Sequence, residues 1–184
     1  MEKERIKCVI VGDENSGKTA LVSAFISGTF ISEHSPTVFD CHDVDAVLEG
    51  NTVPLKICDT GGSEISDRMR PLCYAKANVI LLCVDVMNPQ TMQTAESFWM
   101  REINHFCSKV PVLVVGTKTD LKEKKGRVKT LKETQKRGPL QYEEARKASW
   151  RMGAFDYVQC SAKTSKGILN VFSTAVRIAL NSRK

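Results

Sequence analysis

The sequence lacks the features of several protein classes. It has no C-x-x-C pair, and its seven cysteines are odd in number and partly embedded in short apolar runs. This pattern argues against a disulfide framework and predicts core thiols in a reducing compartment. No apolar run approaches the ~20 residues of a membrane span, and only five apolar residues follow the charged M-E-K-E-R start before Gly12, too few for a signal peptide. We therefore expect a cytoplasmic protein.

Signals for lipidation are also missing from the printed sequence. Glu2 stands where myristoylation requires glycine, and no cysteine lies beyond Cys160, so no C-terminal C-a-a-X site is present. We expect association with a membrane only if a lipidated tail follows Lys184.

Excess charge is absent from most of the chain. Residues 122–137 carry eight Lys or Arg side chains and two Glu, whereas the remaining residues balance at 19 basic and 19 acidic. The basic surplus therefore belongs to one segment, and we expect no binding of nucleic acid. That segment is either a solvated helix face or a docking site for an acidic partner or an anionic membrane. Binding through it would weaken steeply with salt.

Short β-branched runs alternate with longer helical patterns along the chain. The length suits one domain, residues 1–184, with a sizeable core. The predicted strands cover residues 6–11, 41–48, 53–58, 79–84, 112–116 and 156–160, and the predicted helices cover 18–26, 91–106, 142–152 and 166–181.

The connections between these elements set the fold class. The turn E-G-N-T joins the second and third strands as a hairpin, whereas the other strands need crossovers. The sequence therefore predicts an α/β fold, a doubly wound mixed sheet of six strands, five parallel and one antiparallel, flanked by helices. We expect Trp99 and Trp150 to pack from helices onto this sheet. The segment 122–137 is predicted to be a surface insertion with short helical character.

The motif G-D-E-N-S-G-K-T lies between the first strand and the first helix and fits the phosphate-binding loop G-x-x-x-x-G-K-[ST]. Its glycines let backbone N–H groups converge on phosphate oxygens, and the helix N-terminus adds positive potential. Lys18 supplies a point charge and Thr19 a hydroxyl for Mg²⁺. The predicted nucleotide-binding residues here are Gly12, Asp13, Glu14, Asn15, Ser16, Gly17, Lys18, Thr19 and Ala20.

Three further motifs each follow a predicted strand. In D-T-G-G, Asp59 is placed to hold the Mg²⁺ shell and Gly62 to offer its N–H to a terminal phosphate. In T-K-T-D, Asp120 can accept hydrogen bonds from guanine N1–H and N2–H₂, which adenine does not present. C-S-A-K is placed to turn a backbone N–H toward guanine O6. The predicted base-binding residues are Thr117, Lys118, Asp120, Leu121, Ser161, Ala162 and Lys163.

With these four motifs in this order, the chain resembles the Ras superfamily of small GTP-binding proteins over nearly its whole length. The segments S-P-T-V-F-D and D-R-M-R-P-L-C-Y and the insertion after T-K-T-D resemble the Rho family. The resemblance implies the small G-protein fold with a Rho-type insert helix, GTP/GDP and Mg²⁺ as ligands, and Phe30 packed on the base. It also implies that Thr37 senses the γ-phosphate, and that Thr19, Thr37 and Asp59, the last through water, bind Mg²⁺.

The resemblance also implies partners. Val38, Phe39 and Asp40 with Arg70, Pro71 and Leu72 would face effector proteins, and residues 59–74 would form the second switch segment. Exchange factors and a signalling role toward the actin cytoskeleton are implied in the same way. We expect a monomer.

Three positions depart from the family pattern. Glu14 replaces a usual glycine, Gly61 an alanine, and Ser63 the glutamine that orients the attacking water. Ser63 is too short for that role, and Glu14 would crowd an arginine finger. Of the catalytic positions Lys18, Thr37, Ser63 and Glu14, the last two therefore predict slow or absent hydrolysis. Similar departures occur in the Rnd-like atypical branch, which stays GTP-bound.

Three functional hypotheses stay open. The chain is either a GTP-loaded binding module or a conventional switch that cycles with slow hydrolysis. A third possibility is a pseudo-G-protein scaffold, because a carboxylate ~4 Å from a phosphate oxygen repels it by up to about 4 kcal/mol. The intact Lys18, Thr19, Thr37 and Asp120 argue against the scaffold.

Overall fold

The structure is a computed structural model that describes residues 5–31, 37–48, 50–62, 68–124 and 138–182. Ser63 lies outside the described residues. Residues 125–137, which make up most of the predicted insertion, lie outside them as well. The expectation of a helical insert therefore stays a prediction.

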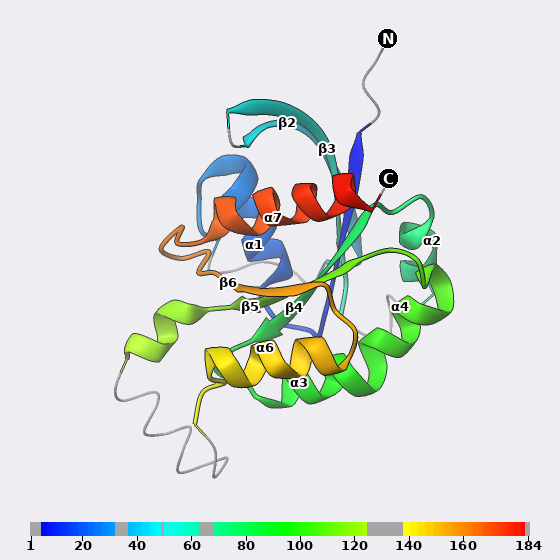
Figure 1. The fold of residues 1–184 in the computed structure, drawn as a ribbon. Helices are drawn as coiled ribbons and strands as arrows, with labels where there is room; N and C mark the ends of the chain where they lie inside the picture. Colours follow the sequence, from blue (N-terminus) through cyan, green and yellow to red (C-terminus); the bar gives the residue numbers. More distant parts are fainter. Residues whose placement is uncertain (1–4, 32–36, 49, 63–67, 125–137, 183–184) are drawn as a thin grey trace.

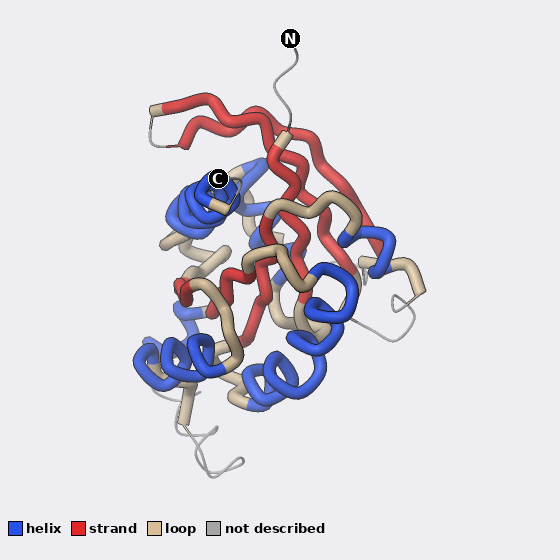
Figure 2. The backbone as a smooth tube through the Cα atoms, turned by 45° about the vertical axis from the view of Figure 1, so that its right-hand side comes forward, coloured by secondary structure: helices blue, strands red, loops and turns tan. Residues whose placement is uncertain are grey.

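Six strands form one sheet in the order β2-β3-β1-β4-β5-β6 (Figure 1). Only β2 and β3 pair antiparallel, and the other four pairings are parallel, which confirms the predicted fold class. The hairpin strands are longer than predicted and curve away from the rest of the sheet (Figure 2). The strands are β1 (Ile6–Val11), β2 (Phe39–Leu48), β3 (Asn51–Thr60), β4 (Val79–Asp85), β5 (Val112–Thr117) and β6 (Asp156–Gln159).

Helices cover both faces of the sheet. On one face, α1 (Lys18–Ser27) and α7 (Ile168–Asn181) pack against alternate strand residues such as Cys8 and Ile10. The intervening residues, such as Val9, face the other layer. That layer contains α2 (Arg70–Tyr74), α3 (Gln90–Thr94), the π-helical turn η2 (Ala95–Trp99), α4 (Met100–Cys107) and α6 (Tyr142–Arg151).

The central strands are apolar on both sides because helices cover both sides. The single helix predicted over residues 91–106 forms as three consecutive helical segments, with a π-helical turn between α3 and α4. A 3₁₀ turn, η3 (Thr119–Glu123), follows β5. Within the described ranges, no helix combines the length and apolarity that a bilayer crossing needs.

The two tryptophans differ from each other in burial. Trp99 is 2% exposed and packs beneath the sheet as predicted. Trp150 is 52% exposed, so its predicted packing on the sheet is wrong. The small residues Ala145 and Ala148 form the buried side of α6, which turns Trp150 outward. The Arg146 guanidinium lies 4.2 Å from the centre of the Trp150 ring.

The cysteines also depart in part from the prediction. Cys41 and Cys58 form a disulfide, so the expectation of free thiols is wrong for this pair. The antiparallel register of β2 and β3 places them directly opposite each other, which spacing along the chain did not reveal. Five cysteines in the described chain are free, and of these Cys107 is partly exposed.

Candidate functional site

The four motifs meet at the carboxyl edge of the sheet. β1, β3, β4, β5 and β6 run parallel, so the segments that follow them leave at one edge, where α/β folds bind ligands. The phosphate loop follows β1, D-T-G-G overlaps the end of β3, T-K-T-D the end of β5, and C-S-A-K follows β6.

The phosphate loop is shaped by close backbone approaches. Gly12 has φ 141°, and a Cβ there would overlap the Cys83 carbonyl. A Cβ on Gly62 would overlap the Gly12 carbonyl and the Glu14 amide nitrogen, so D-T-G-G lies directly against the loop. Only glycine fits these two positions.

The ammonium of Lys18 is held over this loop. Its Nζ donates hydrogen bonds to the carbonyls of Gly12, at 2.9 Å, and Asp13, at 2.7 Å. Burial lowers the pKa of Lys18. Both of these hydrogen-bond acceptors are neutral carbonyls. A buried ammonium held in this way suits an incoming phosphate, because the phosphate supplies a negative charge to pair with it.

Three predicted metal-binding side chains converge. The Thr19 hydroxyl donates to Asp59 Oδ2 at 2.6 Å and lies 2.9 Å from the Thr37 hydroxyl. Asp59 is 2% exposed, and its second oxygen, Oδ1, is buried without a hydrogen-bond partner. Burial raises the pKa of Asp59, although Thr19 and Lys18 oppose this shift.

These residues fit a magnesium ion. Mg²⁺ prefers oxygen ligands and usually combines one or two carboxylates with waters and substrate phosphates. The orphaned oxygen of Asp59 gives such an ion, or one of its waters, a partner. The described ranges contain no group of three His, Cys, Asp or Glu side chains placed to hold a metal, so a metal here would depend on the hydroxyls and on ligands from the nucleotide and water.

We expect Asp59→Asn to stabilise the metal-free protein and to abolish its response to Mg²⁺. The raised pKa means that the folded state binds a proton more tightly than the unfolded state, so stability falls as pH rises from about 4 through the folded-state pKa. A neutral amide removes this slope. Melting curves in EDTA should show a higher melting temperature for Asp59→Asn than for the parent at pH 7, and the difference should shrink as the pH falls toward 4.

The exposed carboxylate of Asp43 provides the matched control. Asp43→Asn should leave both the pH slope and the Mg²⁺ response of the melting temperature unchanged. An Asp59→Asn protein that Mg²⁺ still stabilises as much as the parent would contradict the assignment.

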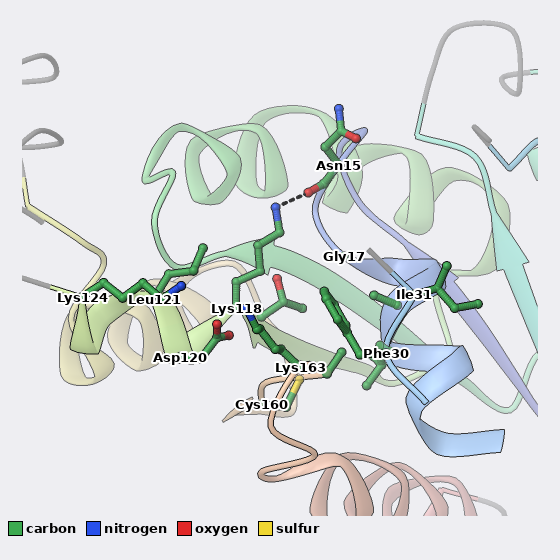
Figure 3. A pocket seen from close by; sticks show the side chains of 14 residues that line it. Asn15, Gly17, Phe30, Ile31, Lys118, Asp120, Leu121, Lys124, Cys160 and Lys163 are labelled. Atoms are coloured by element: carbon green, nitrogen blue, oxygen red, sulfur yellow. Dashed lines mark hydrogen bonds between the residues drawn. The ribbon is translucent and has the colours of Figure 1, made fainter. Parts of the chain in front are cut away.

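A cavity of about 410 Å³ opens beside the phosphate loop (Figure 3). Its size lies within the range of small-ligand pockets. The predicted residues that line it are Asn15, Gly17, Ala20, Phe30, Thr117, Lys118, Asp120, Leu121, Ala162 and Lys163. Leu21, Ile31, Lys124 and Cys160 also line it, although they were not among the predicted nucleotide-binding residues.

Hydrogen bonds fix the predicted base-binding groups. The Ser161 hydroxyl donates to Asp120 Oδ1 at 2.8 Å, which joins C-S-A-K to T-K-T-D. Thr117 Oγ1 donates to the Ser16 carbonyl at 2.6 Å. Lys118 adopts φ 62°, and its ammonium reaches across the cavity to the Asn15 carbonyl (Figure 3).

The sequence missed one partner of Lys118. The Lys118 ammonium pairs with Asp85 Oδ2 at 2.7 Å. Asp85 ends β4 at the same carboxyl edge, and this position was the available signal.

A second missed group connects the phosphate loop to the helical layer. The Trp99 indole Nε1–H donates to Asp13 Oδ1 at 2.7 Å. The Arg70 guanidinium lies 4.5 Å from the centre of the Trp99 ring and forms two 2.6 Å bonds to the Glu102 carboxylate. Tyr74 donates to the same carboxylate. Sequence spacing carries no signal for these contacts.

This network corrects one predicted role. Arg70 is 1% exposed and also donates to the Gly61 carbonyl at 3.2 Å, so it does not face effectors. Leu72, two residues on, is 68% exposed. Val38, Phe39 and Asp40 are exposed, as an effector surface requires.

We expect Trp99→Phe to destabilise the protein by about 1.5–3 kcal/mol, because Asp13 loses a donor to its carboxylate. The melting temperature should fall by about 3–12 °C. Trp150→Phe is the matched control, and its exposed ring predicts a change within about 0.5 kcal/mol. Equal losses in the two variants would show that the indole bond contributes nothing.

Of the insertion, residues 122–124 are described. The Lys122 ammonium donates to the Leu140 carbonyl at 2.5 Å, and burial lowers its pKa. This lysine therefore ties the insertion to the body of the fold.

Comparison with known proteins agrees with this geometry. The sequence model of the Ras family matches residues 7–181. The chain is 40% identical over 180 residues to the GTP-binding protein RHO1 of Candida albicans, covering 98% of this chain and 90% of that protein. It is 40% identical over 178 residues to the human Rho-related GTP-binding protein RhoD, covering 97% and 84% respectively. The GTP-binding protein rho5 of Schizosaccharomyces pombe is 39% identical over 176 residues, covering 96% and 88%. The chain therefore belongs to the Rho family of small GTPases, within the Ras superfamily.

Proposed function

We propose that this protein is a Rho-family signalling module that binds GTP or GDP with Mg²⁺ and hydrolyses GTP slowly or not at all. The convergence of Thr19, Thr37 and Asp59, with the unpartnered Asp59 oxygen, is the observation that carries the nucleotide–metal proposal. Lys18 and the backbone of the phosphate loop hold the phosphates. Asp120, oriented by Ser161, selects guanine.

The impaired hydrolysis rests on two side chains. Ser63 is too short to orient an attacking water, and Glu14, which replaces the family's usual glycine, would crowd an arginine finger. When bound, the metal ion neutralises charge on the phosphates. The chain itself then positions the nucleotide and shields it from bulk water. It supplies no side chain that aligns the attacking water.

The exposure of Glu14 favours nucleotide binding over the scaffold alternative. The side chain is solvent-exposed. At the dielectric constant of water, a carboxylate ~4 Å from a phosphate oxygen costs only about 1 kcal/mol. Glu14 can therefore coexist with a bound nucleotide.

Effector recruitment is proposed to use the exposed Val38, Phe39 and Asp40 together with Leu72. The protein would act in the cytoplasm as a monomer, with actin-directed signalling and exchange factors as the family resemblance implies. A lipidated tail or the basic residues of 125–137 would bring it to an anionic membrane.

The test is to identify the nucleotide released from freshly purified, denatured protein by ion-exchange chromatography. Bound GTP supports the locked module. Bound GDP supports the second candidate, a cycling GTPase, or a preference for GDP, and a single-turnover assay separates these two outcomes. Protein without nucleotide would contradict the proposal and favour the scaffold.

A further inference from the structure

The disulfide pair lies where the two strands of the hairpin approach closely. Cys41 and Cys58 are opposite each other in the β2–β3 ladder, and their Cα atoms are 4.3 Å apart. This separation is close to the ~4.5 Å of a non-hydrogen-bonded antiparallel pair, in which side chains come nearest. The bond therefore forms within an ordinary ladder and needs no rearrangement of the strands.

The two sulfurs differ in access. Cys58 is fully buried, on β3 opposite Val9 of β1. Cys41 is only partly buried, at the edge of the same cluster, because β2 is an edge strand of the sheet. A small thiol or disulfide in solution therefore meets Cys41 first.

The pair adjoins the candidate metal site from both strands. Asp59 directly follows Cys58, and Thr37 precedes Cys41 by four residues. The Thr37 hydroxyl lies 2.9 Å from the Thr19 hydroxyl, and Asp59 Oδ2 accepts a 2.6 Å hydrogen bond from that same hydroxyl. A bond between Cys41 and Cys58 thus limits how far the strand leading from Thr37 can separate from the strand carrying Asp59.

The ladder beside the disulfide carries a pair of like charges. Asp40 lies opposite Asp59 in the ladder, beside the cysteine pair. Like charges directly opposite each other weaken strand pairing.

We propose that Cys41 and Cys58 form a redox-controlled latch, whose disulfide holds the Thr37 and Asp59 strands together and slows the release of bound nucleotide. The proposal rests on the proposed guanine-nucleotide function of this site. In a reducing compartment the pair would be open at rest and close when small disulfides accumulate.

The closing step is thiol–disulfide exchange. The Cys41 thiolate attacks a low-molecular-weight disulfide, forms a mixed disulfide and releases one small thiol. The Cys58 thiolate then attacks the Cys41 sulfur and releases the second small thiol. The two cysteines lose two electrons and two protons, and the small disulfide gains both.

The test measures the bond and its consequence separately. The purified 184-residue chain, loaded with a fluorescent GDP analogue in Mg²⁺ buffer, is equilibrated with oxidised glutathione or with dithiothreitol. Alkylation and peptide mass spectrometry report the Cys41–Cys58 bond, and excess unlabelled GDP reports the release rate. We expect release from the oxidised form to be about three- to tenfold slower.

Matched variants isolate the pair. Cys41→Ser should abolish the redox difference and release nucleotide at the rate of the reduced parent. Cys107→Ser removes a partly exposed thiol outside the latch and should keep the difference. Cys58→Ala, which removes the buried partner, should reproduce the Cys41→Ser result.

Three outcomes would overturn the proposal. Equal release rates for the oxidised and reduced parent would show that the bond does not control the site, while leaving the nucleotide function intact. A stable glutathione adduct on Cys41 without the internal bond would show that the pair does not close. Failure of both forms to retain the labelled GDP would contradict the proposed function itself, and the latch would fall with it.

Discussion

Replacing Asp120 by asparagine is expected to weaken GDP binding by about two to four orders of magnitude. The Ser161 hydroxyl donates to Asp120 Oδ1. An asparagine that keeps this bond through its carbonyl oxygen turns its NH₂ group toward the base, where guanine presents N–H donors. Two hydrogen bonds to a charged acceptor are lost, each worth about 1.5–3 kcal/mol.

The measurement is a calorimetric titration of nucleotide-free protein with GDP and Mg²⁺. Glu144→Gln, on the exposed side of α6, is the control and should bind GDP as the parent does. Xanthosine diphosphate, which has a carbonyl in place of the guanine amino group, should bind Asp120→Asn more tightly than it binds the parent. An Asp120→Asn protein with parental affinity for GDP would remove Asp120 from the base site.

Ser161→Ala tests the positioning of that carboxylate. The variant keeps the acceptor but frees Asp120 from its 2.8 Å hydrogen bond. We expect a smaller loss, about five- to tenfold in GDP affinity, because one neutral-to-charged hydrogen bond and some preorganisation are lost. A loss as large as that of Asp120→Asn would indicate that Ser161 contacts the nucleotide directly.

Local patterns predicted the sheet because each strand carries its own signal. β4 is an apolar run up to its final Asp85, β1 is one interrupted only by Lys7, and both need cover on both faces, while E-G-N-T marks the hairpin. The phosphate loop and Asp120 were predicted because motif residues follow strands, and parallel strands end at one edge. The same rule would have indicated Asp85, which ends β4 and pairs with Lys118.

Contacts between distant helices and loops carry no such local signal. Trp99 and Asp13 are 86 residues apart, and their hydrogen bond depends on how α3, η2 and α4 pack beneath the sheet. Arg70 lies in a segment that resembles an effector surface, yet the Glu102 carboxylate and the Trp99 ring draw it inward. The Cys41–Cys58 pair depends on hairpin register.

Restoring the family residues at two positions should raise the rate of GTP hydrolysis. We expect the double variant Glu14→Gly with Ser63→Gln to hydrolyse bound GTP about ten- to a hundredfold faster than the parent, because a positioned glutamine aligns the attacking water. Glu14 is exposed at the turn of the phosphate loop, so its removal costs little packing. Single-turnover phosphate release is the measurement.

The single variants separate the two contributions. Ser63→Gln alone should give part of the gain, because Glu14 still crowds the glutamine, and Glu14→Gly alone should give little, because no group then orients the water. Glu123→Gly, at an exposed position away from the phosphates, is the control for losing one surface carboxylate. If the double variant is no faster than the parent while retaining GTP, the defect lies elsewhere. Gly61, which replaces the usual alanine and whose carbonyl is held by Arg70, would then be the next position to test.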